Sequence, residues 1–112
     1  MKLSQVVALA VAAACLASCG PTRNQYEVVV TALEGSSRAR NAVYANCLKK
    51  ERTTAWKKEA SVFMNVSEAK APAVFCQRAL DGLVKRRITF ADVSAVYAGD
   101  LTPNIVKVLQ GR

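Results

Sequence analysis

The sequence predicts an all-α protein: a small bundle of four to five helices pinned by one disulfide and preceded by a signal-peptide helix. Three observations support this class. Apolar residues recur at helical spacing, Ser, Thr, Pro and Gly stand where helices start and stop, and no hairpin signal or internal repeat is present. A chain of 112 residues is long enough for one small domain.

The N-terminal stretch, residues 1–18, has the layout of a secretory signal peptide. Lys2 supplies a positive charge, Val6 to Leu16 form an apolar run, and two small residues follow. The run is shorter than the ~20 apolar residues that a membrane-spanning helix needs. We therefore expect this segment to be removed from the mature protein.

The tetrad Leu16-Ala17-Ser18-Cys19 resembles the lipobox of bacterial lipoproteins. In that family a peptidase cuts before the cysteine, whose thiol carries a diacylglycerol. The resemblance implies a covalent lipid on Cys19 and attachment to a membrane, because two or more acyl chains anchor a protein stably. Gly20 stands where enterobacterial members that stay at the inner membrane have Asp, so the resemblance implies the outer membrane, facing the periplasm. The inner membrane is the alternative if the enterobacterial sorting rule does not apply to this chain. The alternative is an ordinary signal peptide followed by a chance cysteine.

The remaining cysteines predict a disulfide. Of the four cysteines, Cys15 leaves with the signal peptide and Cys19 is the lipid acceptor, so Cys47 and Cys76 form an even pair in an oxidising compartment. Their loop predicts about 3.5 kcal/mol of stabilisation by chain entropy. Two buried free thiols are the alternative. We expect no metal and no cofactor besides the lipid, since the chain has no His and no C-x-x-C spacing.

The mature chain divides into two parts. Residues 19–24 form the acylated cysteine with a short tether, and residues 25–112 form the helical domain. Asn24 followed by Glu27 has the spacing of a capping box, which predicts a first helix over Gln25–Glu34.

The spacing of residues leaves two points of secondary structure open. Val28–Thr31 is rich in β-branched residues and favours a strand, but no other segment offers a partner strand, so we favour a helix. From Arg38 to about Met64 the spacing predicts either one long helix or two in series, because Thr53-Thr54 favours a break. The apolar positions at the start of this stretch are Ala39, Ala42, Val43, Cys47 and Leu48.

Three further helices follow from the start and stop signals. Pro72 suits a first helical turn, and the helix after it carries the clearest apolar stripe of the chain. Gly82 interrupts that helix, either to allow a close approach or as a tolerated exposed residue. Thr89 precedes a helix over Phe90–Ala98, and a last helix spans Pro103–Gln110. The stripe comprises Phe75, Cys76, Ala79, Leu80, Leu83 and Val84.

The sequence predicts no catalytic residues. It lacks His, the commonest general base, and it has no nucleophile elbow and no phosphate-binding glycine loop. We therefore expect a protein that is not an enzyme.

The formal net charge of +8 favours anionic partners. Export beyond the cytoplasm separates the protein from nucleic acid, so we expect no nucleic-acid partner. Two basic clusters are candidate anion-binding surfaces; the alternative is solvated helix faces with cations that suit a helix C-terminus. Trp56 is either a core residue or an interfacial ring. The clusters are Lys49, Lys50, Arg52, Lys57 and Lys58, and Lys85, Arg86 and Arg87.

Together these observations predict a membrane-anchored, non-catalytic interaction module that docks onto an envelope protein or assembly, such as a secretion or conjugation system. One alternative is direct binding of an anionic envelope polymer or lipid by the basic clusters. Another is a small periplasmic stress chaperone, since the chain is similar in size, charge and helical character to acid-stress chaperones. The sequence predicts no particular partner and no oligomeric state.

Overall fold

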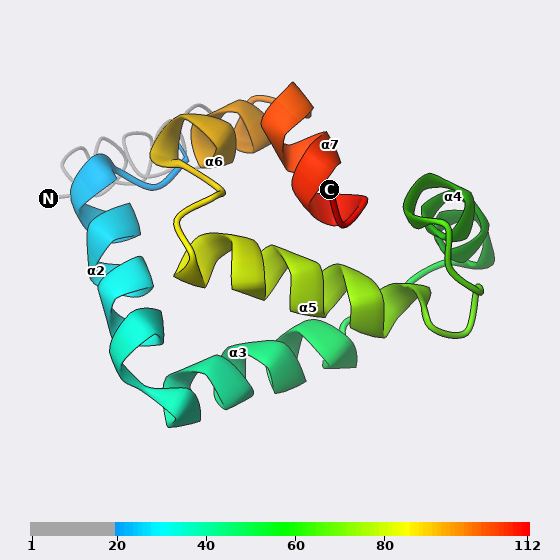
Figure 1. Cartoon of the computed structure of the whole chain (residues 1–112), viewed down its shortest axis with the longest axis horizontal. Coiled ribbons are helices and arrows are strands. Elements are labelled where there is room, and N and C mark those ends of the chain that lie inside the picture. Colours follow the sequence, from blue (N-terminus) through cyan, green and yellow to red (C-terminus); the bar gives the residue numbers. More distant parts are fainter. Residues whose placement is uncertain (1–19) are drawn as a thin grey trace, which may run out of the picture.

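The computed structural model describes residues 20–112, so the expected signal peptide and Cys19 lie outside the described residues. The described part is all-helical and contains no strand, which confirms the predicted fold class (Figure 1). It has one helix more than the upper expected number. The helices are α2 (Arg23–Gly35), α3 (Ser37–Lys49), α4 (Thr54–Met64), α5 (Ala71–Val84), α6 (Phe90–Tyr97) and α7 (Pro103–Leu109). None of these helices is long and apolar enough to cross a bilayer.

Helix α5 is the centre of the bundle. It packs against α2, α3, α4 and α7, and Figure 1 shows it running through the middle, with α3 on one side and α6 and α7 on the other. Its predicted apolar stripe is buried or half-buried throughout, because residues three and four apart share one face of a helix. The buried apolar residues of the core are Tyr26, Val30, Leu33, Met64, Ala71, Cys76, Ile88, Ile105, Val108 and Leu109.

The first helix begins earlier than its capping pattern predicts. Thr22, not Asn24, is the N-cap, and its side chain and that of Gln25 form the capping box that we assigned to Asn24 and Glu27. Both pairs have the same spacing, and the threonine hydroxyl satisfies the amide of Gln25. The β-branched run at residues 28–31 is helical, as favoured, because its alternative strand has no partner.

The stretch after α2 forms two helices in series. Ser36 caps α3, and Thr53 caps α4 by accepting a hydrogen bond from the amide of Trp56. Asn65 ends α4 in the left-handed conformation, with φ of 57°. The break at Thr53 therefore resolves the ambiguity between one helix and two, because an N-cap residue has non-helical backbone angles.

The expected apolar face of α3 is largely exposed, which corrects the prediction of a core stripe there. Ala42 is exposed, as are Val43 (42%) and Leu48 (41%), and α3 has no buried residue. Helix α3 lies at the edge of the bundle, packed against α2 and α5. Side-chain bonds hold it there: the disulfide at Cys47, and Arg40, which donates to the carbonyl of Leu33 at 2.6 Å.

Candidate functional site

An apolar groove lies between α4, α5, α7 and the connection between α6 and α7. Its volume is about 450 Å³. Met64 and Leu109 are buried, whereas Leu101 is 61% exposed. Trp56 packs edge-on against Phe75, with ring centroids 5.6 Å apart, so the tryptophan is half-buried in the groove wall. The groove is lined by Trp56, Glu59, Ala60, Phe63, Met64, Phe75, Leu101 and Leu109.

Two side chains hold the groove walls together. Arg78 of α5 donates to the carbonyl of Leu109 at 2.7 Å and to that of Met64 at 3.4 Å, so it bridges the ends of α7 and α4. Gln110 donates to the carbonyl of Phe63 at 3.2 Å. These bonds satisfy carbonyls that a helix end leaves without an intrahelical partner. The groove is therefore formed in the free chain.

The disulfide Cys47–Cys76 forms as predicted and joins α3 to α5, with Cα atoms 5.9 Å apart. Arg52 lies over it. Its guanidinium donates to the carbonyl of Cys47 at 3.0 Å and lies 5.0 Å from the ring centroid of Trp56 and 5.7 Å from that of Phe75. Arg52 therefore connects the disulfide to the aromatic wall of the groove.

The sequence indicated a cation at position 52 but not this role. The run of basic residues around Arg52 indicated a charged surface. It did not indicate a contact with Phe75, because Phe75 belongs to α5 and is far from Arg52 along the sequence. Arg52 therefore has a structural role, and it is half-buried, so only part of its side chain faces solvent.

The first basic cluster lines a cleft of about 380 Å³ beside the groove. Lys49, Lys50 and Lys57 are brought together there with Arg52, while Lys58 is exposed on α4 and does not line the cleft. The lining residues are Leu48, Lys49, Lys50, Glu51, Arg52, Lys57 and Pro72. Four of the five residues of the first predicted anion-binding cluster therefore lie together around one cleft.

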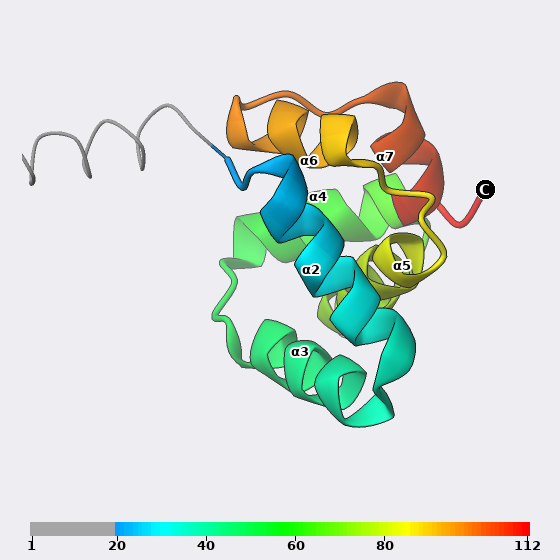
Figure 2. The same cartoon turned by 90° about the vertical axis from the view of Figure 1, so that its left-hand side faces the viewer.

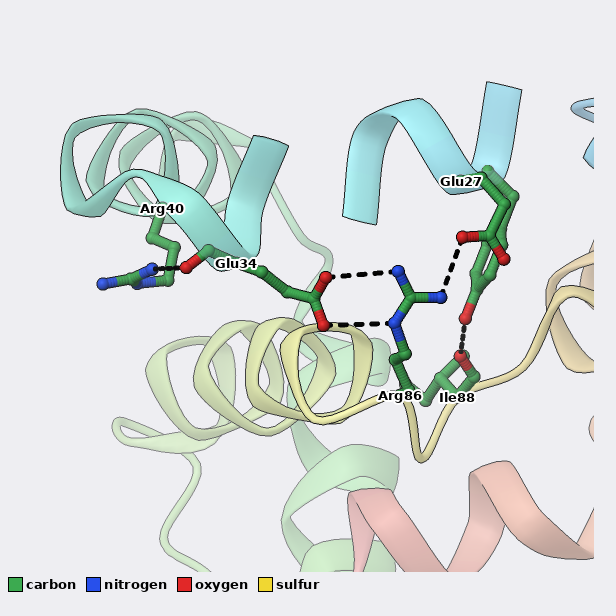
Figure 3. A network of polar contacts seen from close by, with 6 residues as sticks. Glu27, Glu34, Arg40, Arg86 and Ile88 are labelled. Carbon is green, nitrogen blue, oxygen red and sulfur yellow. Dashed lines mark hydrogen bonds and ion pairs between the residues drawn. The ribbon is translucent and has the colours of Figure 1, made fainter. Parts of the chain in front are cut away.

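The second basic cluster is divided: Lys85 and Arg87 line a small pocket of about 120 Å³ together with Asp81, whereas Arg86 points to α2. Arg86 pairs with Glu27 at 2.9 Å and with Glu34 at 3.1 Å, so it joins the end of α5 to α2 (Figure 3). Hydrogen bonds to Glu34 and Glu27 raise the pKa of Arg86. Arg87 donates to the carbonyl of Arg112. Arg86 is therefore paired with carboxylates of α2 at a partly exposed position, and it does not join the pocket that Lys85 and Arg87 line.

The one buried acidic residue of the described part, Asp92, is a structural group. Burial opposes its ionisation, but hydrogen bonds from the Thr102 hydroxyl, the Thr89 amide, the Asn104 amide group and the Thr89 hydroxyl outweigh it and lower the pKa of Asp92. The carboxylate accepts from Thr102 at 2.6 Å and from the Thr89 amide at 2.9 Å. Asp92 thereby ties the start of α6 to the start of α7.

Within residues 20–112 no group of three His, Cys, Asp or Glu side chains is arranged to hold a metal ion. No protein-family model, curated protein sequence or solved structure matches the chain. The site is therefore interpreted from its own geometry.

Proposed function

We propose that this protein is a lipid-anchored, non-catalytic interaction module of the bacterial envelope. The lipobox resemblance at Leu16-Ala17-Ser18-Cys19 supports the anchor, and Gly20 after it supports an outer-membrane position facing the periplasm. The observation that carries the interaction function is the apolar groove between α4, α5 and α7, which is braced by Arg78 and partly exposed at Leu101. A preformed concave apolar surface is the usual form of a binding site.

The chemistry of the groove favours an apolar protein segment that carries a cation. Seven of its eight lining residues are apolar, and the eighth is Glu59. Glu59 is exposed and makes no salt bridge within the described part of the chain, so a Lys or Arg of the partner can pair with it. The aromatic wall of Trp56 and Phe75 is the kind of surface that dominates protein–protein binding energy. The proposed partner is therefore a segment of an envelope protein or assembly.

The experiment places a photo-crosslinking amino acid at Leu101 in cells. Leu101 is at the groove, and Val62, which is 83% exposed on α4 and does not line the groove, is the matched control. We expect a covalent adduct with an apolar, cation-bearing segment of an envelope protein from position 101 and none from position 62.

The substitution Glu59→Lys reverses the charge of the side chain that we propose pairs with a cation of the partner. It should abolish the adduct from position 101 while the protein level stays unchanged. Equal adducts from both positions, an adduct with lipid alone, or an adduct insensitive to Glu59→Lys would each contradict the proposal.

A further inference from the structure

We propose that the protein lies on an anionic bilayer with one defined side, formed by the end of α6 and the corner between α3 and α4, against the lipid phosphates. This membrane-facing side comprises residues 20–22, Val96 and Tyr97, and residues 49–58. The inference rests on the proposed lipid at Cys19, and it adds an orientation and a second, electrostatic contact. Three observations converge on it.

The first observation is the short distance along the chain between the anchor and the folded domain. Gly20 packs directly on Tyr97: a Cβ at Gly20 would lie 3.0 Å from the Cβ of Tyr97. Helix α2 begins at Arg23, so little slack remains. Since consecutive Cα atoms are only ~3.8 Å apart, a lipid on Cys19 would hold Tyr97 at the level of the headgroups.

The second observation is the exposure of this surface. Tyr97 is 67% exposed, and its neighbour Val96 is exposed as well. A tyrosine ring with an apolar body and a polar hydroxyl suits the boundary between headgroups and water. An exposed aromatic beside the anchor therefore matches a lipid surface.

The third observation is the position of the first basic cluster. Figure 2 shows the first described residues, the end of α6, the end of α3 and the start of α4 all on the left-hand side of the molecule. Residues 85–87 and the C-terminus lie on the opposite side. The cation-lined cleft therefore lies on the same side as the first described residues, which directly follow the proposed lipid acceptor Cys19.

The charge of this corner favours an anionic surface. Residues 49–59 contain five cations and two carboxylates. Lys49, Lys50 and Lys57 line the 380 Å³ cleft and make no salt bridge within residues 20–112, where Arg86 supplies both of the ion pairs. Glu51 lines the same cleft and Asp100 follows α6. These two carboxylates reduce the net charge of the membrane-facing side, which remains positive. Cations near an anionic bilayer are attracted within a Debye length.

The test measures lysine reactivity in the mature lipidated protein. The protein is inserted into phosphatidylcholine vesicles with or without phosphatidylglycerol, and the acetylation rate of each lysine is read by mass spectrometry. We expect the anionic lipid to slow labelling of Lys49, Lys50 and Lys57 by about fivefold each, and added salt to remove the effect. Lys85 follows α5 and Lys107 belongs to α7, segments that lie on the opposite side (Figure 2), so these two lysines are the matched controls and should not change.

The outcomes separate this inference from the proposed function. An acylated Cys19 with equal labelling of all five lysines in both vesicles would overturn the orientation and leave the anchor intact. An unacylated N-terminus would overturn the anchor and the orientation together. Equal shielding by inorganic phosphate without vesicles would show a small-anion cleft in place of a bilayer contact, and would also overturn the inference.

Discussion

The glycine in the last turn of α5 provides the sharpest test of how the bundle is packed. Gly82 is buried, and a Cβ built on it would lie 2.7 Å from Cδ1 of Ile88 and 2.8 Å from Cγ1 of Val108. Both neighbours are themselves buried, and the carbonyl of Gly82 accepts the amide of Ile88 at 2.9 Å. Neither atom can move away easily, because its own surroundings are close-packed.

Two opposing effects set the result of Gly82→Ala. Alanine in a helix interior is favoured over glycine by ~1 kcal/mol, whereas overpacking a core costs ~1–3 kcal/mol. Contacts below 3 Å to two buried side chains place this site toward the upper part of that range. We therefore expect Gly82→Ala to reduce the free energy of unfolding by about 1–2 kcal/mol.

The matched control is Gly35→Ala at the end of α2, where an added Cβ would meet nothing within 4 Å. It should stabilise by about 0.5 kcal/mol. Urea unfolding of both variants with the disulfide intact measures the difference, and each kcal/mol corresponds to about 4–8 °C in Tm. If Gly82→Ala were as stable as Gly35→Ala, the close approach of α5, Ile88 and α7 would be wrong.

Three other predictions follow from named contacts. Replacing Cys47 and Cys76 together by Ser should cost about 3.5 kcal/mol in urea unfolding, because the 29-residue separation makes a long loop; an unchanged midpoint would contradict the bond. Folding lowers the pKa of Asp92, so its carboxylate stabilises the folded state at pH values above the ordinary pKa of 3.8. This stabilisation is lost as the pH falls through the lowered pKa of the folded state. Asp92→Asn should therefore destabilise the domain at pH 7 and differ little from wild type at low pH, and a pH-independent difference would refute this. Arg86→Gln should lower Tm more than Lys85→Gln at low salt, with the gap closing as salt rises, since within residues 20–112 Arg86 makes ion pairs and Lys85 makes none; a gap that does not respond to salt would count against these ion pairs.

Local signals in the sequence determined most of the helix boundaries. Thr89 with Asp92, Thr102 with Pro103, and Pro72 each lie within the first turn of the helix that they cap or begin. Such signals act over three or four residues, so they are visible in the chain without a tertiary structure. The same locality explains the error at α2. The pairs Thr22/Gln25 and Asn24/Glu27 have the same spacing, so the sequence does not distinguish them, and the path of the chain into the helix selects the first.

The roles of the cations depended on partners far away in sequence. Lys49 and Arg86 belong to similar runs of basic residues, yet one lines an open cleft and the other is neutralised by carboxylates on α2. Likewise, the spacing of apolar residues on α3 was correct for a helix but did not show that the helix lies at the edge.

The sequence alone therefore determined the helical class, the disulfide pair and, apart from α2, the approximate helix starts, because these follow from spacing and from local hydrogen bonding. The groove between α4, α5 and α7, and the common side on which the first described residues and the first basic cluster lie, were decided by the tertiary structure. The physical reason is that packing brings together residues whose separation along the chain carries no periodic signal.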